Sequence, residues 1–165
     1  MGYISDLREK VGHAPIIMAS AGVLILNDKG QLLLQRRADN HLWGYPGGSM
    51  ELGESFEECA KREALEETGL KCLELEYFTH RSGKEMHYVY DEGDEVYITE
   101  VVFLCTRFTG ELHAQESEVL EQRFFDLDKL PKSISRVNQS VVRALVEKRT
   151  AKKGPRKIKI GSIRI

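Results

Sequence analysis

Residues 48–70 decide the fold, and they are Gly-Ser-Met-Glu-Leu-Gly-Glu-Ser-Phe-Glu-Glu-Cys-Ala-Lys-Arg-Glu-Ala-Leu-Glu-Glu-Thr-Gly-Leu. Ser55 followed by Glu58 has the Ser-x-x-Glu pattern of a capping box, which predicts a helix that begins just after Ser55. Gly69 suits a left-handed C-terminal cap, so the helix should end just before it. A glycine-rich segment therefore leads into a helix with a defined start and a defined end.

One face of this helix is unusually acidic. At about 100° per residue, Glu63, Glu66 and Glu67 fall on one arc, and Arg62 lies at its edge. Like charges three or four residues apart repel each other by a few tenths of a kcal/mol per pair, so solubility does not explain the pattern. Converging carboxylate oxygens suit Mg²⁺ or Mn²⁺, which also bind phosphate oxygens. The spacing predicts a divalent metal site, and a plain solvated acidic face is the alternative.

The whole stretch resembles the Nudix box, Gly-x5-Glu-x7-Arg-Glu-U-x-Glu-Glu-x-Gly-U, where U is a bulky aliphatic residue. Eight specified positions match in register: Gly48, Glu54, Arg62, Glu63, Glu66, Glu67, Gly69 and Leu70. The one departure is Ala64 at the first U position, which affects helix packing and none of the acids. The resemblance covers residues 14–148 and implies the Nudix fold, an α/β protein built as an α/β/α sandwich with a mixed central β-sheet.

The resemblance also implies roles for the acidic helix face. Glu66 and Glu67 would be the principal ligands of Mg²⁺ or Mn²⁺. Glu63 would be a further ligand or the base that activates water. Arg62 would orient Glu63 or its neighbour through a charge-assisted hydrogen bond.

Further contributions to the metal site are expected from outside this face. By resemblance, Gly48 would offer a backbone carbonyl, and Glu54 would link the helix to its loop or join a second metal. A later Phe-Phe-Asp-Leu-Asp-Lys-Leu-Pro segment resembles the strand and turn after the active-site loop of many Nudix proteins. In those proteins a glutamate shortly before the aromatic pair often supplies another ligand or the catalytic base. Spacing favours Glu118, then Glu121, then Glu116.

Substrate contacts are less well defined by the sequence. Arg36 and Arg37 can reach a phosphate, although arginines at strand ends are usually solvated. Trp43 and Tyr45 can stack on a base, although aromatic residues before the box more often line the core. Tyr88 lies 18 residues beyond the box, where a tyrosine resembles the marker of diadenosine-polyphosphate hydrolases. Packing is the alternative role for Tyr88.

Hydrophobic periodicity predicts the remaining elements. Residues 3–11 and 135–148 have helical spacing. The run 16–26 is a nearly continuous apolar run, which suits a strand buried on both faces, and the following Asn-Asp-Lys-Gly turn predicts a hairpin with a strand at 31–36. Further strands are predicted at 71–81, 86–90, 96–108 and 122–125.

Charge divides the chain into two parts. Residues 1–150 carry 18 basic and 26 acidic residues, a net charge of −8, whereas residues 151–165 carry six basic residues and no acid. An acidic domain is a poor general binder of nucleic acid. We predict one Nudix hydrolase domain at 1–150, with an N-terminal helical extension at 1–13 and a basic C-terminal tail at 151–165. The tail leaves a nucleic acid partner open.

Cysteine use and hydropathy bear on the cellular setting. Cys59, Cys72 and Cys105 are odd in number and lack the paired spacing of a metal site, which favours a reducing, cytoplasmic location. The longest apolar stretch, residues 14–26, is too short to span a bilayer, and the segment before it does not resemble a signal peptide. We therefore expect no membrane partner, and a homodimer is left open.

These features predict a metal-dependent pyrophosphohydrolase. The substrate would be a nucleoside diphosphate linked to another moiety X, and water attack on phosphorus would give a nucleoside monophosphate and phosphorylated X. One alternative is removal of pyrophosphate from RNA 5′ ends, with the basic tail holding the RNA. Another is a non-catalytic nucleotide sensor on the same fold, which would not need to keep the complete set of acids.

Overall fold

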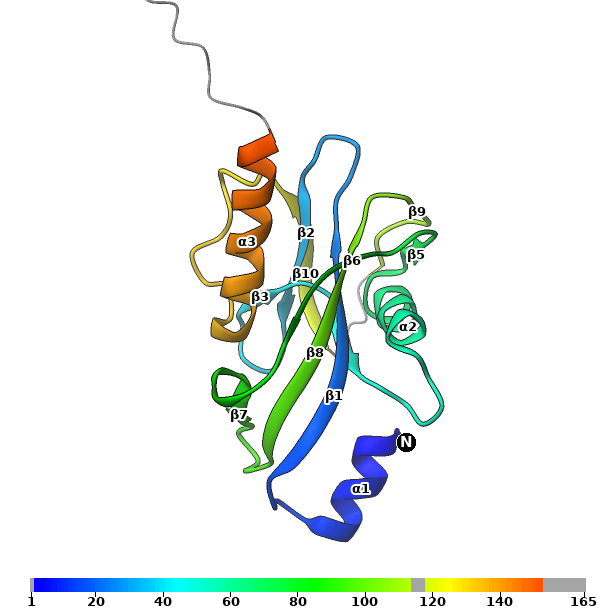
Figure 1. Ribbon diagram of the computed structural model, residues 1–165, viewed down its shortest axis with the longest axis vertical. Coiled ribbons are helices and arrows are strands. Elements are labelled where there is room, and N and C mark those ends of the chain that lie inside the picture. Colours follow the sequence, from blue (N-terminus) through cyan, green and yellow to red (C-terminus); the bar gives the residue numbers. More distant parts are fainter. Residues whose placement is uncertain (1, 114–117, 153–165) are drawn as a thin grey trace, which may run out of the picture.

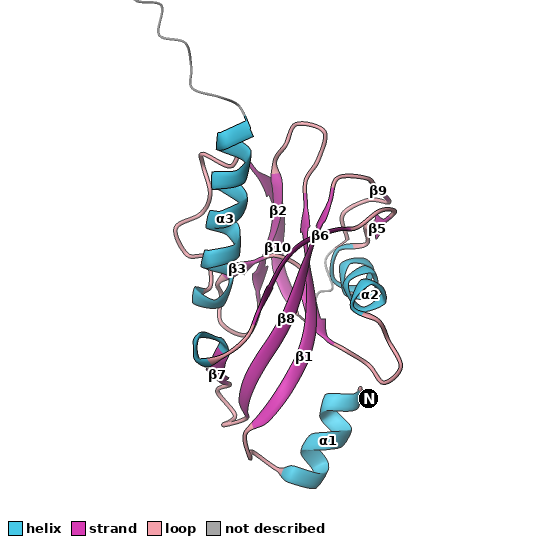
Figure 2. Cartoon of the chain, in the orientation of Figure 1, coloured by secondary structure: helices cyan, strands magenta, loops and turns pink. Residues whose placement is uncertain are grey.

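The computed structural model describes residues 2–113 and 118–152. Helices α2 (Phe56–Thr68) and α3 (Arg136–Lys152) lie on opposite sides of the β-strands, which gives three layers (Figure 1). A third helix, α1 (Tyr3–Val11), lies beside one end of the long strands (Figure 2). The architecture is the α/β/α sandwich that the sequence predicted.

The central layer contains a mixed sheet of order β4-β1-β8-β6, in which β7 also pairs with β8. β1 and β8 run parallel, from Ile16 opposite Val96 to Ile25 opposite Cys105, and the other pairs are antiparallel. The strands are β1 (Ile16–Ile25), β4 (Gly47–Ser49), β6 (Glu76–Arg81), β7 (His87–Val89) and β8 (Glu95–Cys105).

A second sheet completes this layer with the order β10-β2-β3, and β5 and β9 form a short separate pair. Its strands are antiparallel, and β2 pairs with both neighbours. These elements and one short 3-10 helix are β2 (Leu32–Arg37), β3 (Trp43–Gly44), β5 (Lys71–Cys72), η1 (Lys84–Met86), β9 (Phe108–Thr109) and β10 (Val119–Phe125).

Strand β1 joins the two halves of the core. Ala21, Val23 and Ile25 belong to the cluster that includes the buried residues of α2. Leu24 and Leu26, on alternate positions, belong to the cluster that includes the buried residues of α3. Successive side chains of a strand point to opposite faces. The continuous apolar run therefore reflects a strand covered on both sides, as predicted.

Helix α2 begins and ends where the sequence predicted. The Ser55 side chain accepts from the Glu58 backbone N–H, and the Glu58 side chain accepts from the Ser55 backbone N–H, so the capping box is complete. Gly69 adopts φ 75°, the left-handed conformation expected of a C-terminal cap. Ala64, the departure from the bulky aliphatic pattern, is fully buried against the sheet.

Two predicted strand arrangements were wrong. The hairpin between the strands predicted at 16–26 and 31–36 is limited to one bridge, Leu26–Leu32, because β1 and β2 then continue into different sheets. The strand predicted at 71–81 is divided into β5 and β6, because β5 pairs with β9 and β6 with β8.

Other predicted boundaries moved by a few residues. The strand predicted at 96–108 is β8 followed by the separate β9, and the strand predicted from 122 begins at Val119. The closing helix runs from Arg136 to Lys152, and the helix at 3–11 is confirmed. Most of the predicted basic tail, residues 153–165, lies outside the described residues, so the division of the chain at residue 150 stays a prediction.

Candidate functional site

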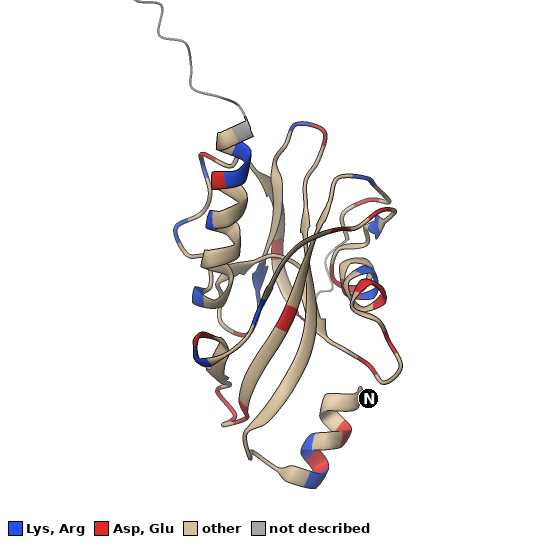
Figure 3. Ribbon diagram, in the orientation of Figure 1, with Lys and Arg blue, Asp and Glu red and all other residues tan. Residues whose placement is uncertain are grey.

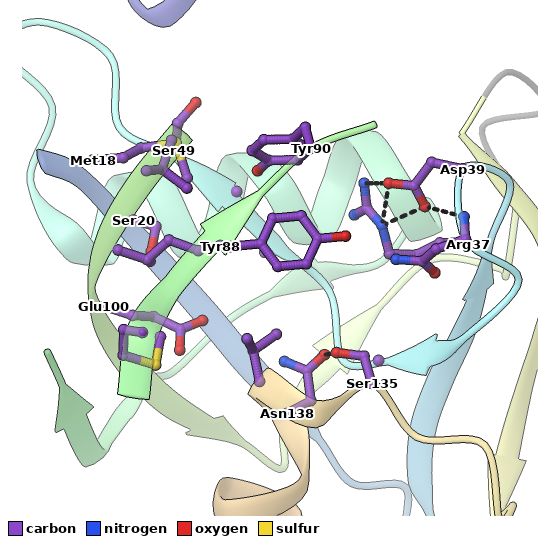
Figure 4. A pocket seen from close by; sticks show the side chains of 18 of the residues that line it. Met18, Ser20, Arg37, Asp39, Ser49, Tyr88, Tyr90, Glu100, Ser135 and Asn138 are labelled. Atoms are coloured by element: carbon purple, nitrogen blue, oxygen red, sulfur yellow. Dashed lines mark hydrogen bonds and ion pairs between the residues drawn. The ribbon is translucent and has the colours of Figure 1, made fainter. Parts of the chain in front are cut away.

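A cavity of about 790 Å³ lies beside α2, and most of the predicted acids line it. It also extends to α1 and to the start of α3 (Figure 4 shows part of it). Acidic residues occur on α2, beside basic ones, and on the loop before it (Figure 3). The lining residues from the predicted metal site are Gly48, Glu63, Glu66, Glu67 and Glu118.

Glu67 is the most enclosed of these acids, with 3% of its surface exposed. Its Oε2 accepts hydrogen bonds from the Gly47 backbone N–H at 2.9 Å and from Gln35 Nε2 at 2.8 Å. Burial raises the pKa of Glu67 to about 7, although these two hydrogen bonds oppose the shift. The carboxylate is thus fixed between α2, β2 and the glycine-containing segment 47–53, here called the glycine loop. A nearby cation would stabilise its charge there.

Arg62 connects the acidic helix face to the preceding loop. Its Nε and one terminal nitrogen bind the two oxygens of Glu54 at 2.7 and 2.9 Å, a bidentate arrangement. The other terminal nitrogen donates to Glu63 Oε1 at 2.6 Å and Glu66 Oε2 at 3.2 Å. Arg62 also donates to the Ser49 carbonyl at 2.9 Å. It therefore holds Glu63 and Glu66 on the same side of the helix and ties that face to the loop.

Glu54 does not line the cavity but completes this link. Its Oε2 also accepts from the Glu51 backbone N–H at 3.0 Å. The hydrogen bonds from Arg62 lower the pKa of Glu54, so the carboxylate keeps its charge over a wider pH range. Two roles were predicted for Glu54, a link between loop and helix and a place in a second metal site. These hydrogen bonds support the link.

Glu63 faces the glycine loop. Burial raises the pKa of Glu63, and the charges of Glu66 and Glu118 raise it further, whereas Arg62 lowers it. A Cβ atom added at Gly48 would lie 2.6 Å from the Glu63 carboxylate. Any larger residue at position 48 would therefore force the Glu63 carboxylate to move away from the backbone there.

The three glutamates that sequence spacing ranked as Glu118, then Glu121, then Glu116 differ in their position in the structure. Glu118 lines the cavity, and its charge acts on Glu63. Glu121 pairs in register with Arg36 on β2 and does not line the cavity. Glu116 lies outside the described residues. Strand β10, which begins just after Glu118, is tied to α2, because Gln122 Nε2 donates to the Glu67 carbonyl at 2.5 Å.

The donor set fits a hard divalent cation, although the side chains are not preassembled. Among residues 2–113 and 118–152, no three His, Cys, Asp or Glu side chains already form a group that could hold a metal ion. Glu63, Glu66 and Glu67 nevertheless line one cavity, and the charge of Glu63 raises the pKa of Glu67. Carboxylate oxygens that repel one another beside a glycine loop are the donors that Mg²⁺ and Mn²⁺ prefer.

Two residues singled out as substrate contacts lie elsewhere. Trp43 is buried in the core, with its ring perpendicular to that of Phe125 at 4.9 Å between centroids. The guanidinium of Arg123 lies 5.9 Å from the centroid of the Trp43 ring. Arg36 is half-buried on β2, and neither Arg36 nor Trp43 is among the residues that line the cavity. Packing, the alternative role for Trp43, is the one that its position supports.

Tyr88 does line the cavity, in the company of residues that the sequence did not single out as a group. Its ring meets that of Tyr90 edge-on, with centroids 4.9 Å apart. Figure 4 shows Tyr88 between Ser20 on one side and an Arg37–Asp39 pair on the other. Arg37 Nε donates to Asp39 Oδ1 at 3.0 Å, and its NH2 donates to Oδ2 at the same distance. Aromatic faces and fixed polar groups thus share one wall of the cavity.

A buried polar network forms a further part of the lining. Tyr45 donates to Glu100 Oε2 at 3.0 Å, and Arg81 NH2 donates to the Tyr45 hydroxyl at 2.8 Å and pairs with Glu100. Burial and the charge of Glu100 raise the pKa of Tyr45, so its hydroxyl stays protonated. Ser135 donates to Asn138 Oδ1 at 3.1 Å at the start of α3. Residues 45, 81, 100 and 138 are far apart in sequence, and no local motif predicts their meeting.

Two general findings accompany the site. No helix in the described part of the chain is long and apolar enough to cross a membrane. Cys59, Cys72 and Cys105 are buried free thiols.

Comparisons with known proteins agree with the fold and the motif. The model of the NUDIX domain matches residues 17–145. An RNA pyrophosphohydrolase of Shewanella denitrificans is 39% identical over 61 residues, which are 37% of this chain and 36% of that protein. An NAD-capped RNA hydrolase, NudC of Vibrio cholerae, is 29% identical over 140 residues, which are 84% of this chain and 48% of that protein. The chain thus spans less than half the length of these curated relatives.

The fold also occurs among solved structures. A MutT NUDIX hydrolase from Burkholderia pseudomallei superimposes with a TM-score of 0.65 at 24% sequence identity, over 80% of this chain and 97% of that one. A MutT protein from Methanosarcina mazei gives a TM-score of 0.62 at 22% identity, over 84% of this chain and 96% of that one. At this level of identity the likeness concerns the fold alone.

Proposed function

Because the chain belongs to the Nudix family, we propose that it is a metal-dependent pyrophosphohydrolase. The reaction would be attack of water on a nucleoside diphosphate linked to a moiety X, with release of a nucleoside monophosphate and phosphorylated X. One observation carries the proposal: Glu63, Glu66, Glu67 and Glu118 line a single cavity beside a glycine loop. Nudix hydrolases generally use divalent metal cations, and Mg²⁺ or Mn²⁺ would serve here.

Each acid has a proposed part in holding the cation. Glu66 and Glu67 would be the principal ligands, with the Gly48 carbonyl and Glu63 as further donors. A bound divalent cation would neutralise the dense negative charge of the diphosphate. Glu54 would act from outside the cavity by keeping Arg62 in place, since both of its oxygens are already hydrogen bonded.

The protein side chains would supply the proton transfer. Glu63 or Glu118 would take the proton from the attacking water, because both line the cavity and the pKa of Glu63 is raised by burial and by the charge of Glu118. A base with a raised pKa accepts a proton more readily near neutral pH. Arg62 would fix the direction of the Glu63 carboxylate through its 2.6 Å hydrogen bond.

Tyr88 is the proposed substrate contact that the cavity supports. Stacking of a base on an aromatic ring is worth about 1–3 kcal/mol. The neighbouring Arg37 can contact a phosphate or a base edge from the same wall. Arg36 and Trp43 have no comparable support, because neither lines the cavity.

The decisive experiment replaces Glu67 with Gln. With Mg²⁺ or Mn²⁺ and a panel of nucleoside diphosphate derivatives, Glu67→Gln should lower kcat at least about a hundredfold, because a metal ligand or base is lost. Glu57→Gln, at an exposed position of the same helix, is the matched control and should keep wild-type turnover. Near-normal turnover by Glu67→Gln would refute the proposed site.

An RNA 5′ end is a second candidate substrate, because the Shewanella relative is named an RNA pyrophosphohydrolase. Phosphate contacts from residues 151–165 would make RNA binding fall steeply with salt. Deleting that segment should then abolish binding of a 5′-triphosphorylated RNA while leaving turnover of small nucleotides unchanged.

A non-catalytic sensor is less consistent with the chain, because the complete acid set is retained. We also propose a cytoplasmic location, which the three free thiols support.

A further inference from the structure

Helix α1 lies outside the family match, which begins at residue 17, yet it forms part of the same cavity. Ile4, Ser5 and Arg8 are among the lining residues. Figure 1 shows α1 beside the lower ends of β1 and β8, near the loop that leads to α2. An element that the family domain does not include thus completes the wall of the proposed substrate site.

The first turn of α1 is attached to the loop that carries the metal-site glycines. The Tyr3 backbone N–H donates to Glu51 Oε2 at 2.9 Å. Glu51 lies in the loop between Gly48 and Glu54. A carboxylate at a helix N-terminus is favourable, because it satisfies a free backbone N–H and interacts with the positive end of the helix dipole.

The second attachment comes from Arg8. Its guanidinium donates to the Gly12 carbonyl at 3.0 Å, the Ala14 carbonyl at 2.7 Å and the Glu95 carbonyl at 2.8 Å. Its Nε lies 3.3 Å from Asp94 Oδ2. Arg8 is therefore committed to the turn between β7 and β8 and acts as a positioning residue. Helix α1 is therefore attached to the loop before α2 through Tyr3 and to residues 94 and 95 through Arg8.

The two ends of the cavity differ in chemistry. Beside α1, Ile4 shares the lining with Met18 and Ile98, which are register partners on β1 and β8. At the other side of Tyr88 lies the Arg37–Asp39 pair (Figure 4). Fixed donors and acceptors suit the edge of a nucleobase, whereas an apolar wall suits a ring face or another weakly polar group.

We propose that α1 is the part of the enzyme that contacts the moiety X and so determines which X is accepted. This inference rests on the proposed function and extends it. The polar end would hold the nucleoside common to the substrates, and the wall formed by Ile4 and Ser5 would meet the variable group.

Two substrates that differ only in X test the proposal. P1,P2-diadenosine diphosphate has adenosine as X, and the methyl ester of adenosine 5′-diphosphate has only a methyl group, which is too small to reach α1. Ile4→Ala should lower kcat/KM roughly 5–10-fold for the diadenosine compound and less than about twofold for the methyl ester, because one apolar contact discriminates about 10-fold or more. An equal loss on both substrates, or no change on either, would overturn the inference.

A second variant avoids any question of folding. Ser5 is exposed and lines the cavity, so Ser5→Trp narrows that end without disturbing the core. It should lower kcat/KM for the diadenosine compound by roughly tenfold or more and spare the methyl ester. Val11→Ala, an exposed truncation on the same helix that does not line the cavity, is the matched control and should change neither. Equal effects of Ser5→Trp on both compounds would contradict the proposal.

Hydrogen exchange separates this inference from the proposed function. Diadenosine diphosphate added without metal should slow exchange of the α1 backbone amides in the wild type, but the methyl ester should not. Arg8→Gln should accelerate α1 exchange and raise KM for the diadenosine compound with little change in kcat. Unchanged α1 exchange at saturating diadenosine diphosphate would refute the contact even if turnover is normal. Protection of α1 without any metal-dependent turnover would instead support the contact and contradict the hydrolase.

Discussion

Two parts of the cavity lining are built in different ways. One is the acidic face of α2, and the other, here called the opposite wall, includes Ile4, Arg37, Tyr88 and Asn138. Glu63, Glu66 and Glu67 come from a single helical turn, and one residue, Arg62, organises two of them. The opposite wall draws on β2, β7 and the helices at both ends of the described chain. The acidic face holds groups suited to chemistry, whereas the opposite wall holds groups suited to recognition. Substitutions on the first should therefore lower kcat, and substitutions on the second should raise KM.

After Glu67→Gln, the largest effect that would test this division is expected at Arg62. Arg62→Ala removes the hydrogen bonds to Glu54 and Glu63, so the two carboxylates lose their common orientation. We expect kcat to fall roughly 100-fold with KM changed less than about threefold. Arg62→Lys should restore little, because an ammonium group cannot bind Glu54 in a bidentate manner. Steady-state kinetics would decide, and a pure KM effect would show that Arg62 belongs to recognition.

The unfolding free energy of the metal-free protein should also depend on the acidic face. Burial raises the pKa of Glu67 to about 7 from a usual 4.5, so between those values the folded protein binds more protons than the unfolded chain. The unfolding free energy should therefore decrease as pH rises from 5 to 7, by on the order of 1–2 kcal/mol. Glu54, whose pKa is lowered, acts in the opposite direction but only below about pH 4.5.

Urea denaturation in EDTA at several pH values measures this slope. Glu67→Gln should remove most of it, since glutamine does not titrate. A slope of the same size in Glu67→Gln and wild type would place its origin elsewhere in the protein.

A smaller effect is expected at Glu118, which lines the cavity and whose charge acts on Glu63. Loss of its charge should lower kcat about tenfold in Glu118→Gln if it helps to bind metal or accept a proton. Glu121→Gln is the matched control, because Glu121 lies close to Glu118 in sequence, on β10, but does not line the cavity. Equal activity of the two variants would remove Glu118 from the site.

How far the sequence predicted the molecule follows the same division. The limits of α2, its cap and its acid arc depend on neighbours within a few residues, so local spacing was enough to predict them. The network of Tyr45, Arg81 and Glu100 depends on which strands become neighbours, which no local pattern encodes. The wrong hairpin has the same cause, because a turn at Asn27 favours pairing locally but the wider core separates β1 from β2.

Aromatic residues show the limit most clearly, because the same chemistry serves core and ligand. Trp43 and Tyr88 were both candidate substrate contacts, and periodicity could not distinguish them. The structure places Trp43 against Phe125 in the core and Tyr88 at the cavity wall. Whether an aromatic side chain faces the cavity depends on how the sheets and helices pack together. Residue periodicity in a single sequence does not predict that packing.

The smallest expected effect concerns this aromatic wall. Tyr88→Ala should raise KM for a nucleotide substrate roughly fivefold, which corresponds to about 1 kcal/mol of lost stacking, and should leave kcat within about twofold. Tyr88→Phe should keep the wild-type KM, since the ring face is retained. Tyr77→Ala, at an exposed position outside the cavity, is the control for general loss of an aromatic side chain. If Tyr88→Ala lowers kcat instead, this wall takes part in the chemical step and its separation from the acidic face does not hold.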